Sequence, residues 1–277
     1  MASTVEAAAA VTGATSAPKR APWIDLAQFV VLVVGLFYLV MTGANSLNYN
    51  WQWYRMPKLL YRVIDGEFVW GPLMEGLFVT FEITAWSLPL AAVIGLTTAL
   101  LRRSNSFAGR ALATGYLQLI RNTPILVQVY IFYFVFAPMF GLGGFWACVL
   151  ALSFHEGSFA AEIFRAGIES VHKGQWEASD SLGIKRADTY HYVVLPQAIP
   201  LMLPPLTSQI VTLIKHSSIL SAVAIFDLTT MALDQVAETF MAFEIWLTTG
   251  AIYLVVTVTL SVLINLFENR IRRRSQR

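Results

Sequence analysis

Six long apolar runs constrain the fold of this chain more than any other feature. They lie at about residues 23–44, 75–101, 124–140, 144–167, 206–226 and 242–267. A helix needs about 20 mostly apolar residues to cross the hydrocarbon core of a bilayer, and each run approaches that length. The first run is too long for a signal-peptide core and lacks a convincing cleavage site, so it is predicted to be a retained span. The sequence therefore predicts an all-α, polytopic membrane protein.

The composition agrees with this prediction. A hydrophobic fraction of 56% with only 13% charged residues does not suit a soluble surface. This composition predicts membrane lipid as the surroundings of the chain. The net charge of +2 provides no basic surface for nucleic acid, so no nucleic acid is expected among the partners. The single cysteine, Cys148, lies in an apolar run and is predicted to be a buried small hydrophobe.

The distribution of Lys and Arg predicts the orientation, because these residues are retained on the cytoplasmic side. With the N-terminus inside, fifteen of the 19 Lys and Arg residues fall in cytoplasmic segments. Arg55, Lys58 and Arg62 fall on the opposite side, and Lys215 lies inside a span. Both termini are therefore predicted to be cytoplasmic.

The longest predicted inner loop runs from Gly167 to Pro196 and is polar enough to be solvated. Within it, Gln175 to Leu182 is a good helical stretch, and Gly183 supplies a C-terminal stop that tolerates a left-handed backbone. A short amphipathic helix of this kind can present an apolar side chain to the groove of a partner protein.

This loop resembles the permease subunits of ABC importers, which carry there the pattern E-A-A, three residues, G, nine residues, I, one residue, L-P. Here Glu177, Ala178 and Ser179 are followed at those intervals by Gly183, Val193 and Leu195–Pro196. The two departures, Ser for the second Ala and Val for Ile, are small changes in volume. The resemblance implies a coupling helix that docks on an ATPase through Gln175, Trp176, Glu177, Ala178, Ser179 and Gly183.

Four further stretches resemble the polar amino acid branch of that family. They are R-N-T-P-I-L-V-Q at 121–128, A-E-I-F-R-A-G-I at 161–168, G-Q-W-E-A at 174–178 and L-I-K-H-S-S-I-L at 213–220. The resemblance covers about residues 71–274. It implies the transmembrane domain of a type I ABC importer for polar amino acids, with one N-terminal helix, a five-helix core and a cytoplasmic coupling helix.

The resemblance also implies the partners and the location. We expect a dimer of ABC ATPase subunits, a second permease subunit that is either this chain or a paralogue, and a periplasmic amino-acid-binding protein. The location implied is a bacterial inner membrane. We expect this chain to bind no cofactor, with ATP and Mg²⁺ used by the partner ATPase.

The expected organisation has five parts. Residues 1–22 are a disordered cytoplasmic tail, 23–45 an extra N-terminal transmembrane helix, 46–73 a periplasmic loop, 74–270 the permease domain and 271–277 a basic cytoplasmic tail.

A charged side chain at bilayer depth is costly, so it is expected to pair with another group, to face a water-filled cavity or to serve a function. His155 and Glu156 lie near the middle of the fourth run, and Lys215 and His216 near the middle of the fifth. Lys215 and Glu156 complement the carboxylate and the ammonium of an amino acid, or they form a salt bridge with each other. Gln128 lines the path or makes an interhelical hydrogen bond, and Ser217 lines the path or allows close packing. The expected substrate path is Gln128, His155, Glu156, Lys215, His216 and Ser217.

Several kinds of chemistry are not predicted. The string H-E-G-S-F from His155 begins like a zinc-binding H-E-x-x-H helix, but Phe159 replaces the second ligand, so no metal site is expected. His172 and His191 are predicted to be solvated, and the sequence contains no phosphate-binding G-x-x-x-x-G-K-[ST] loop. The alternatives are an intramembrane enzyme using His155 and Glu156 and a proton-driven transporter, neither of which needs a docking helix.

Overall fold

The computed structural model describes residues 22–46 and 49–275. The predicted disordered tail lies outside these residues except for Pro22, and no side chain of the predicted basic tail, 271–277, is described. The chain divides into two compact units, residues 1–51 and 52–277. In the first unit, α2 (Pro22–Ser46) forms over the first apolar run, and its stretch Leu26–Ala44 is long and apolar enough to cross a membrane.

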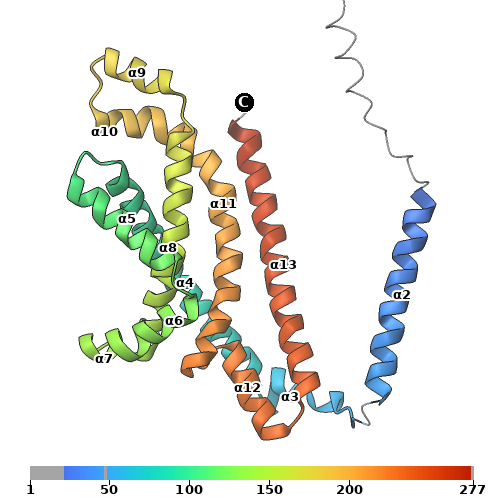
Figure 1. The fold of residues 1–277 in the computed structure, drawn as a ribbon. Helices are drawn as coiled ribbons and strands as arrows, with labels where there is room; N and C mark the ends of the chain where they lie inside the picture. The colour runs from blue at the N-terminus through green and yellow to red at the C-terminus, as the bar shows by residue number, and fades with distance from the viewer. Residues whose placement is uncertain (1–21, 47–48, 276–277) are drawn as a thin grey trace, which may run out of the picture. The chain divides into compact units, whose positions relative to one another are not determined.

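The second unit is built mainly of helices (Figure 1). Its elements are η1 (Trp53–Arg55), α3 (Pro57–Leu60), β1 (Tyr61–Ile64), β2 (Glu67–Trp70), α4 (Pro72–Arg103), α5 (Phe107–Arg121), α6 (Ile125–Tyr130), the π-helical η2 (Ile131–Phe136), α7 (Ala137–Phe140), α8 (Gly144–Glu169), α9 (Lys173–Ser181), α10 (Arg186–Asp188), the π-helical η3 (Thr189–Val194), α11 (Leu195–His216), the 3₁₀-helical η4 (Ser217–Val223), α12 (Leu228–Thr239) and α13 (Ala242–Ser275). Figure 1 shows α9 and α10 at one end of this unit and α3 and α12 at the other.

Five helical segments of the described chain are long and apolar enough to cross a membrane. The third predicted span differs, because residues 107–121 and 125–140 form two segments bent by 108° at the intervening break. If this bent pair is one span, the total is six. The fifth span also starts earlier than predicted, since α11 begins at Leu195.

The packing of α4 against α8 organises the second unit. Small residues let the two backbones approach closely: a Cβ added at Gly95 would lie 2.7 Å from the Ala160 Cβ, and one at Gly157 would lie 2.9 Å from a methyl group of Ile94. Close approach through small residues is the usual way in which membrane helices associate, because lipid supplies no hydrophobic force between them. The Ser87 hydroxyl adds a 3.2 Å hydrogen bond to the Val149 carbonyl across the contact.

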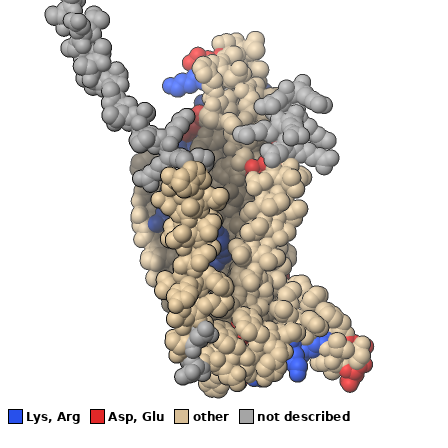
Figure 2. Space-filling model, turned by 90° about the vertical axis from the view of Figure 1, so that its right-hand side faces the viewer, with Lys and Arg blue, Asp and Glu red and all other residues tan. Residues whose placement is uncertain are grey.

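The buried apolar side chains form three clusters along the unit. One joins α4, α6, α8, α11 and η4 and includes the fully buried Cys148, which confirms the prediction for the single cysteine. The second joins α3, α4, α12 and α13, and the third lies where α8 and α11 approach the loop that holds α9. The described surface in Figure 2 is formed largely by residues other than Lys, Arg, Asp and Glu, as expected for helices that face lipid.

The predicted outer loop, residues 46–73, contains a β-hairpin that was not predicted from the sequence. Strands β1 and β2 pair antiparallel, with Tyr61 opposite Trp70 and Ile64 opposite Glu67. Asp65 and Gly66 connect them, both with positive φ, which is the pattern of a tight two-residue hairpin turn.

Candidate functional site

The short helix predicted in the inner loop is α9, Lys173–Ser181. His172 caps its start by accepting a 3.1 Å hydrogen bond at Nδ1 from the Gly174 N–H, so this histidine has a structural role besides being exposed. Gly183 follows the helix with φ +66°, the left-handed conformation that glycine adopts most easily. The Gly183 N–H donates to the Asp180 carbonyl, which completes the turn that ends the helix.

The six predicted coupling residues divide into two groups. Gln175, Glu177, Ala178 and Gly183 are exposed, whereas Ser179 is buried and Trp176 is partly buried. Leu182 follows Trp176 and Ser179 at three-residue spacing in the sequence, but its side chain is 77% exposed. Trp176 and Ser179 therefore hold α9 against the rest of the unit, whereas Glu177 and Leu182, which directly follows the helix, are exposed.

Trp176 fixes α9 to the rest of the unit through two ring contacts. The Tyr190 ring meets it edge-on at 5.2 Å between centroids, and the Arg103 guanidinium carbon lies 5.6 Å from the centre of the indole. Arg103 is at the end of α4, and its Nη1 lies 3.4 Å from Oε1 of Glu169 at the end of α8. The loop that holds α9 thus contacts the end of α4 directly, and Arg103 links this end of α4 to the end of α8.

A buried polar cluster joins the middle of α8 to the end of α11. Glu156 is 2% exposed, and its Oε1 accepts a 2.6 Å hydrogen bond from Nδ1 of His216. Its Oε2 and its main-chain carbonyl both accept hydrogen bonds from the Gln209 amide, at 2.9 and 2.6 Å. Both carboxylate oxygens of Glu156 are therefore held by side chains of α11.

Gln128 connects this cluster to the bend between α5 and α6. Its amide nitrogen donates to the carbonyls of Ile120 and Thr123, at 2.6 and 2.8 Å. Its oxygen then faces Nδ1 of His155 at 3.2 Å and must act as the acceptor. The structure thus gives Gln128 an interhelical hydrogen bond, and His155 carries its proton on Nδ1.

Lys215 does not join this cluster. The alternative of a Lys215–Glu156 salt bridge is wrong, since Glu156 pairs with His216 and the Lys215 side chain is exposed. Consecutive residues on a helix point about 100° apart, so the neighbour of a buried residue easily faces outward. Ser217 is fully buried and its hydroxyl donates to the Ile214 carbonyl, a geometry that supports close packing.

A cavity of about 180 Å³ adjoins Glu156 between α4, α8 and α11. Its walls are mainly apolar, with Gln209 and Thr207 as polar members besides Glu156. At the roughly 30 Å³ that a water molecule occupies in the liquid, this space equals about six waters. The cavity thus places one carboxylate against mainly apolar walls.

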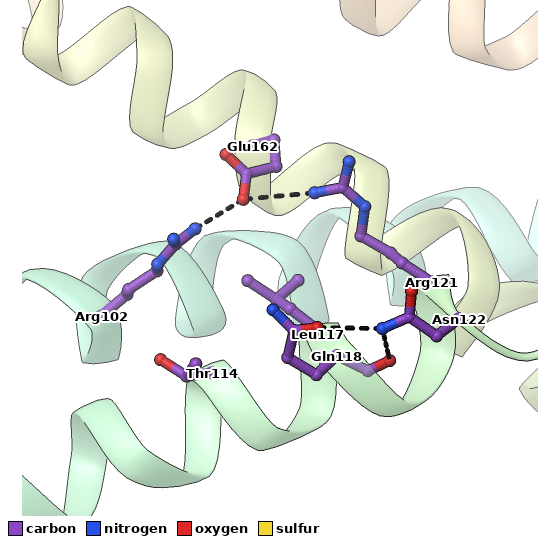
Figure 3. Close-up of a pocket in the computed structure, with 7 residues that line it drawn as sticks. All are labelled: Arg102, Thr114, Leu117, Gln118, Arg121, Asn122 and Glu162. Carbon is purple, nitrogen blue, oxygen red and sulfur yellow. Dashed lines mark hydrogen bonds and ion pairs between the residues drawn. The ribbon is translucent and has the colours of Figure 1, made fainter.

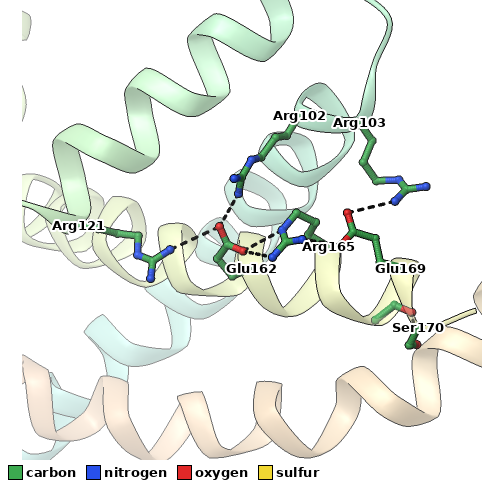
Figure 4. Close-up of polar contacts among 8 residues, drawn as sticks. Arg102, Arg103, Arg121, Glu162, Arg165, Glu169 and Ser170 are labelled. Carbon is green, nitrogen blue, oxygen red and sulfur yellow. Dashed lines mark hydrogen bonds and ion pairs between the residues drawn. The ribbon is translucent and has the colours of Figure 1, made fainter.

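A network of ion pairs (Figure 4) lies farther along α8 than Glu156, towards the loop that holds α9. Glu162 Oε1 lies 2.5 Å from Nη1 of Arg102 and 3.4 Å from Nη1 of Arg121, and its Oε2 lies 2.7 Å from Nη2 of Arg165. Glu169 continues the network by pairing with Arg165 at 2.5 Å. A single carboxylate thus holds arginines from α4, α5 and α8 together.

An open pocket of about 360 Å³ lies beside this network, lined by Arg102, Arg121, Glu162 and polar side chains of α5 (Figure 3). Gln118 and Asn122 bond to each other at its edge, at 2.9 Å. Glu162 reaches Arg165 three residues along its own helix, whereas Arg102 and Arg121 come from two other helices.

We expect Glu162→Gln to lower the stability of the purified protein, because three arginines would lose their shared carboxylate. The side chains are 26–44% exposed, so each pair contributes modestly, and the expected loss is about 1 to 2 kcal/mol. Thermal unfolding in detergent measures it, with the exposed Glu75→Gln as the matched control. Equal midpoints for the two variants would show that the network adds no stability.

The comparisons with known proteins agree with this architecture. The family model described as "Binding-protein-dependent transport system inner membrane component" matches residues 91–273. The probable glutamine ABC transporter permease protein GlnM of Bacillus subtilis (strain 168) is 37% identical over 202 residues, which are 72% of this chain and 93% of that protein. The glutamine transport system permease protein GlnP of Escherichia coli (strain K12) is 34% identical over 203 residues, covering 72% and 93%.

Solved structures show the same fold. The structure titled "Crystal structure of an amino acid ABC transporter with histidines" matches with a TM-score of 0.67 at 37% identity, covering 72% of this chain and 94% of that one. A chain of the MetNI methionine ABC transporter matches with a TM-score of 0.60 at 23% identity, covering 74% and 96%, and supports the fold alone. This chain therefore belongs to the binding-protein-dependent transport system inner membrane component family, as a permease subunit of an ABC importer.

Proposed function

We propose that this permease imports a polar amino acid by alternating access, driven by a separate ATPase that docks on α9. The observation that carries the proposal is the combination of the α9 loop, which contacts the end of α4 through Trp176, with a buried carboxylate cluster between α8 and α11. The similarity to two permeases named for glutamine supports a polar amino acid as cargo.

The exposed face of α9 is the proposed ATPase contact. Glu177 and Leu182 offer one charge and one apolar side chain to a groove of the partner. Trp176 contacts both Arg103 and Tyr190. Because Arg103 belongs to α4 and pairs with Glu169 of α8, a displacement of α9 would also move these two helices. Closure of two ATPase subunits would thereby bring two such loops together.

The proposed substrate site is the cluster of Gln128, His155, Glu156 and His216 with its adjoining cavity. Glu156 would bind the ammonium of the substrate, for which a buried carboxylate is the natural partner. Lys215, exposed at the end of α11, would meet the substrate carboxylate only where the path is completed by a second permease subunit. Ser217, which is buried, would stabilise this end of α11 through the hydrogen bond from its hydroxyl to the Ile214 carbonyl.

The proposed assembly contains two ATPase subunits, two permease subunits and a periplasmic amino-acid-binding protein. The second permease is either another copy of this chain or a relative. Both termini would be cytoplasmic, which places α9 on the same side as the ATPase and the β1–β2 hairpin on the side of the binding protein. ATP and Mg²⁺ would be bound by the ATPase, and this chain would carry no catalytic residue.

We expect Glu177→Lys to lower amino-acid uptake at least tenfold, because a reversed charge at the docking face opposes the ATPase groove. A like-charge contact at an interface costs several kcal/mol, and each 1.4 kcal/mol is a tenfold change. The test is uptake in vesicles together with co-purification of the ATPase. Glu67→Lys, which changes an exposed carboxylate on β2, is the matched control for co-purification of the ATPase.

In both variants the amount of chain in the membrane should equal that of the wild type, because Glu177 and Glu67 are both exposed. If Glu177→Lys still co-purified with the ATPase and transported at the wild-type rate, the proposal that α9 contacts the ATPase would be contradicted. Loss of the chain from the membrane would instead point to a role in folding.

A further inference from the structure

The buried cluster between α8 and α11 has the composition of a transition-metal site. His155, Glu156 and His216 each offer one ligand atom, and these atoms all lie within 4.8 Å of one another. Two imidazoles and one carboxylate form a ligand set of zinc sites that keep an open fourth position. We propose that these three residues bind a divalent transition-metal ion of the Zn²⁺ type.

The contact between His216 and Glu156 is close to what such an ion needs. Nδ1 and Oε1 are now 2.6 Å apart, with a proton between them. Zinc bonds of about 2.0 to 2.2 Å in a tetrahedral arrangement separate neighbouring ligand atoms by roughly 3.3 Å. A metal ion can therefore replace that proton if the two side chains separate by less than one ångström, and His216 is only partly buried and has room to adjust.

The surrounding hydrogen bonds orient two of the ligands. Gln128 accepts the Nδ1 proton of His155, so the neutral imidazole keeps its lone pair on Nε2, as a metal ligand requires. Gln209 holds Oε2 of Glu156, which leaves Oε1 for the ion. Metal-binding histidines usually have such an outer partner on the second ring nitrogen, and the partner's loss weakens metal affinity.

The cluster is distinctive within the chain. Within residues 22–46 and 49–275 it is the one group of three or more His, Cys, Asp or Glu side chains found close enough to share an ion. Imidazole nitrogens favour zinc and its neighbours over magnesium or calcium, which prefer oxygen ligands alone. The sequence prediction of no metal site considered α8 alone, whereas the third ligand comes from α11.

Binding would have a functional consequence. An ion held by residues of both helices ties α8 to α11 and occupies the proposed substrate site, so Zn²⁺ should inhibit uptake. This inhibition rests on the proposed function, but the metal binding itself does not. The two parts can therefore fail separately.

The binding test uses the purified full-length chain and the metal alone. Titration with Zn²⁺ should show one tight site per chain, and Co²⁺ should give the visible absorption of a tetrahedral site with nitrogen and oxygen ligands. We expect His155→Gln and His216→Gln to weaken Zn²⁺ binding at least tenfold, and Gln128→Met to weaken it roughly 10- to 100-fold by loss of the outer partner. His191→Gln, which changes an exposed histidine of the inner loop, should bind as the wild type does.

Two results would overturn the metal site. One is the absence of stoichiometric binding to the wild type, and the other is unchanged binding in both His155→Gln and His216→Gln while each elutes as a folded, monodisperse species. Stoichiometric binding by a wild-type preparation that shows no ATP-driven uptake would support the site and contradict the proposed function. Uptake that is active and insensitive to saturating Zn²⁺ would overturn the inhibition.

Discussion

Glu156→Gln is expected to reduce amino-acid uptake about 100-fold. The variant keeps the size of the side chain and removes the charge that would bind the substrate ammonium inside the helix bundle. Losing one member of a buried, hydrogen-bonded charge pair costs about 2 to 5 kcal/mol, and each 1.4 kcal/mol is a tenfold change. Initial uptake rates in vesicles, with the binding protein and ATP supplied, measure the effect.

Glu82→Gln is the matched control for this variant. Glu82 lies on α4 with its side chain exposed, so the same chemical change there should leave uptake within twofold of the wild type. Glu156→Gln should also still co-purify with the ATPase, because α9 is distant along the chain from the cluster. Uptake near the wild-type rate in Glu156→Gln would remove the carboxylate from the substrate site.

Gly183→Pro is expected to uncouple ATP hydrolysis from uptake, with uptake falling at least tenfold. Gly183 has φ +66°, whereas proline is restricted to about −65°, so the turn that ends α9 cannot form. Proline also removes the N–H that bonds to the Asp180 carbonyl. Since an incompatible proline costs about 3 kcal/mol or more, the loop would take another conformation. The measurement is the ratio of amino acid transported to ATP hydrolysed.

Gly183→Asn provides a sharp comparison, because asparagine tolerates the left-handed conformation better than other side chains do. A Cβ at this position meets no atom within 4 Å, so the added side chain has space. We expect Gly183→Asn to retain most of the uptake. If both variants transported equally well, the conformation of Gly183 would have no part in coupling.

The membrane helices could be predicted from the sequence because apolar length alone decides whether a segment can span a bilayer. The break before Pro124 has a sequence signal, because proline disfavours a helical backbone in the preceding residue. The 108° angle and the bonds from Gln128 back to Ile120 and Thr123 belong to the assembled structure. The β1–β2 hairpin could have been predicted, because the dipeptide Asp65–Gly66 is typical of a two-residue hairpin turn, although this stretch was predicted to be a loop.

The candidate site was predicted in part. Depth along two helices predicted that Glu156 lies level with Lys215 and His216, and the structure brings only His216 to it, because depth carries no information about rotation. The choice of His216 over Lys215 depends on which face of α11 packs against α8, a property of the assembled bundle. The arginines around Glu162 were missed for the same reason, because they come from the ends of other helices.

A permease that is driven by an ATPase must accumulate its substrate against a concentration gradient. The measurement is uptake of a labelled polar amino acid that the binding protein retains, into proteoliposomes that contain the permease, its ATPase and the binding protein. We expect accumulation with ATP and none with a non-hydrolysable analogue, whether or not a proton gradient is present. Accumulation driven by a proton gradient in the absence of ATP would contradict it.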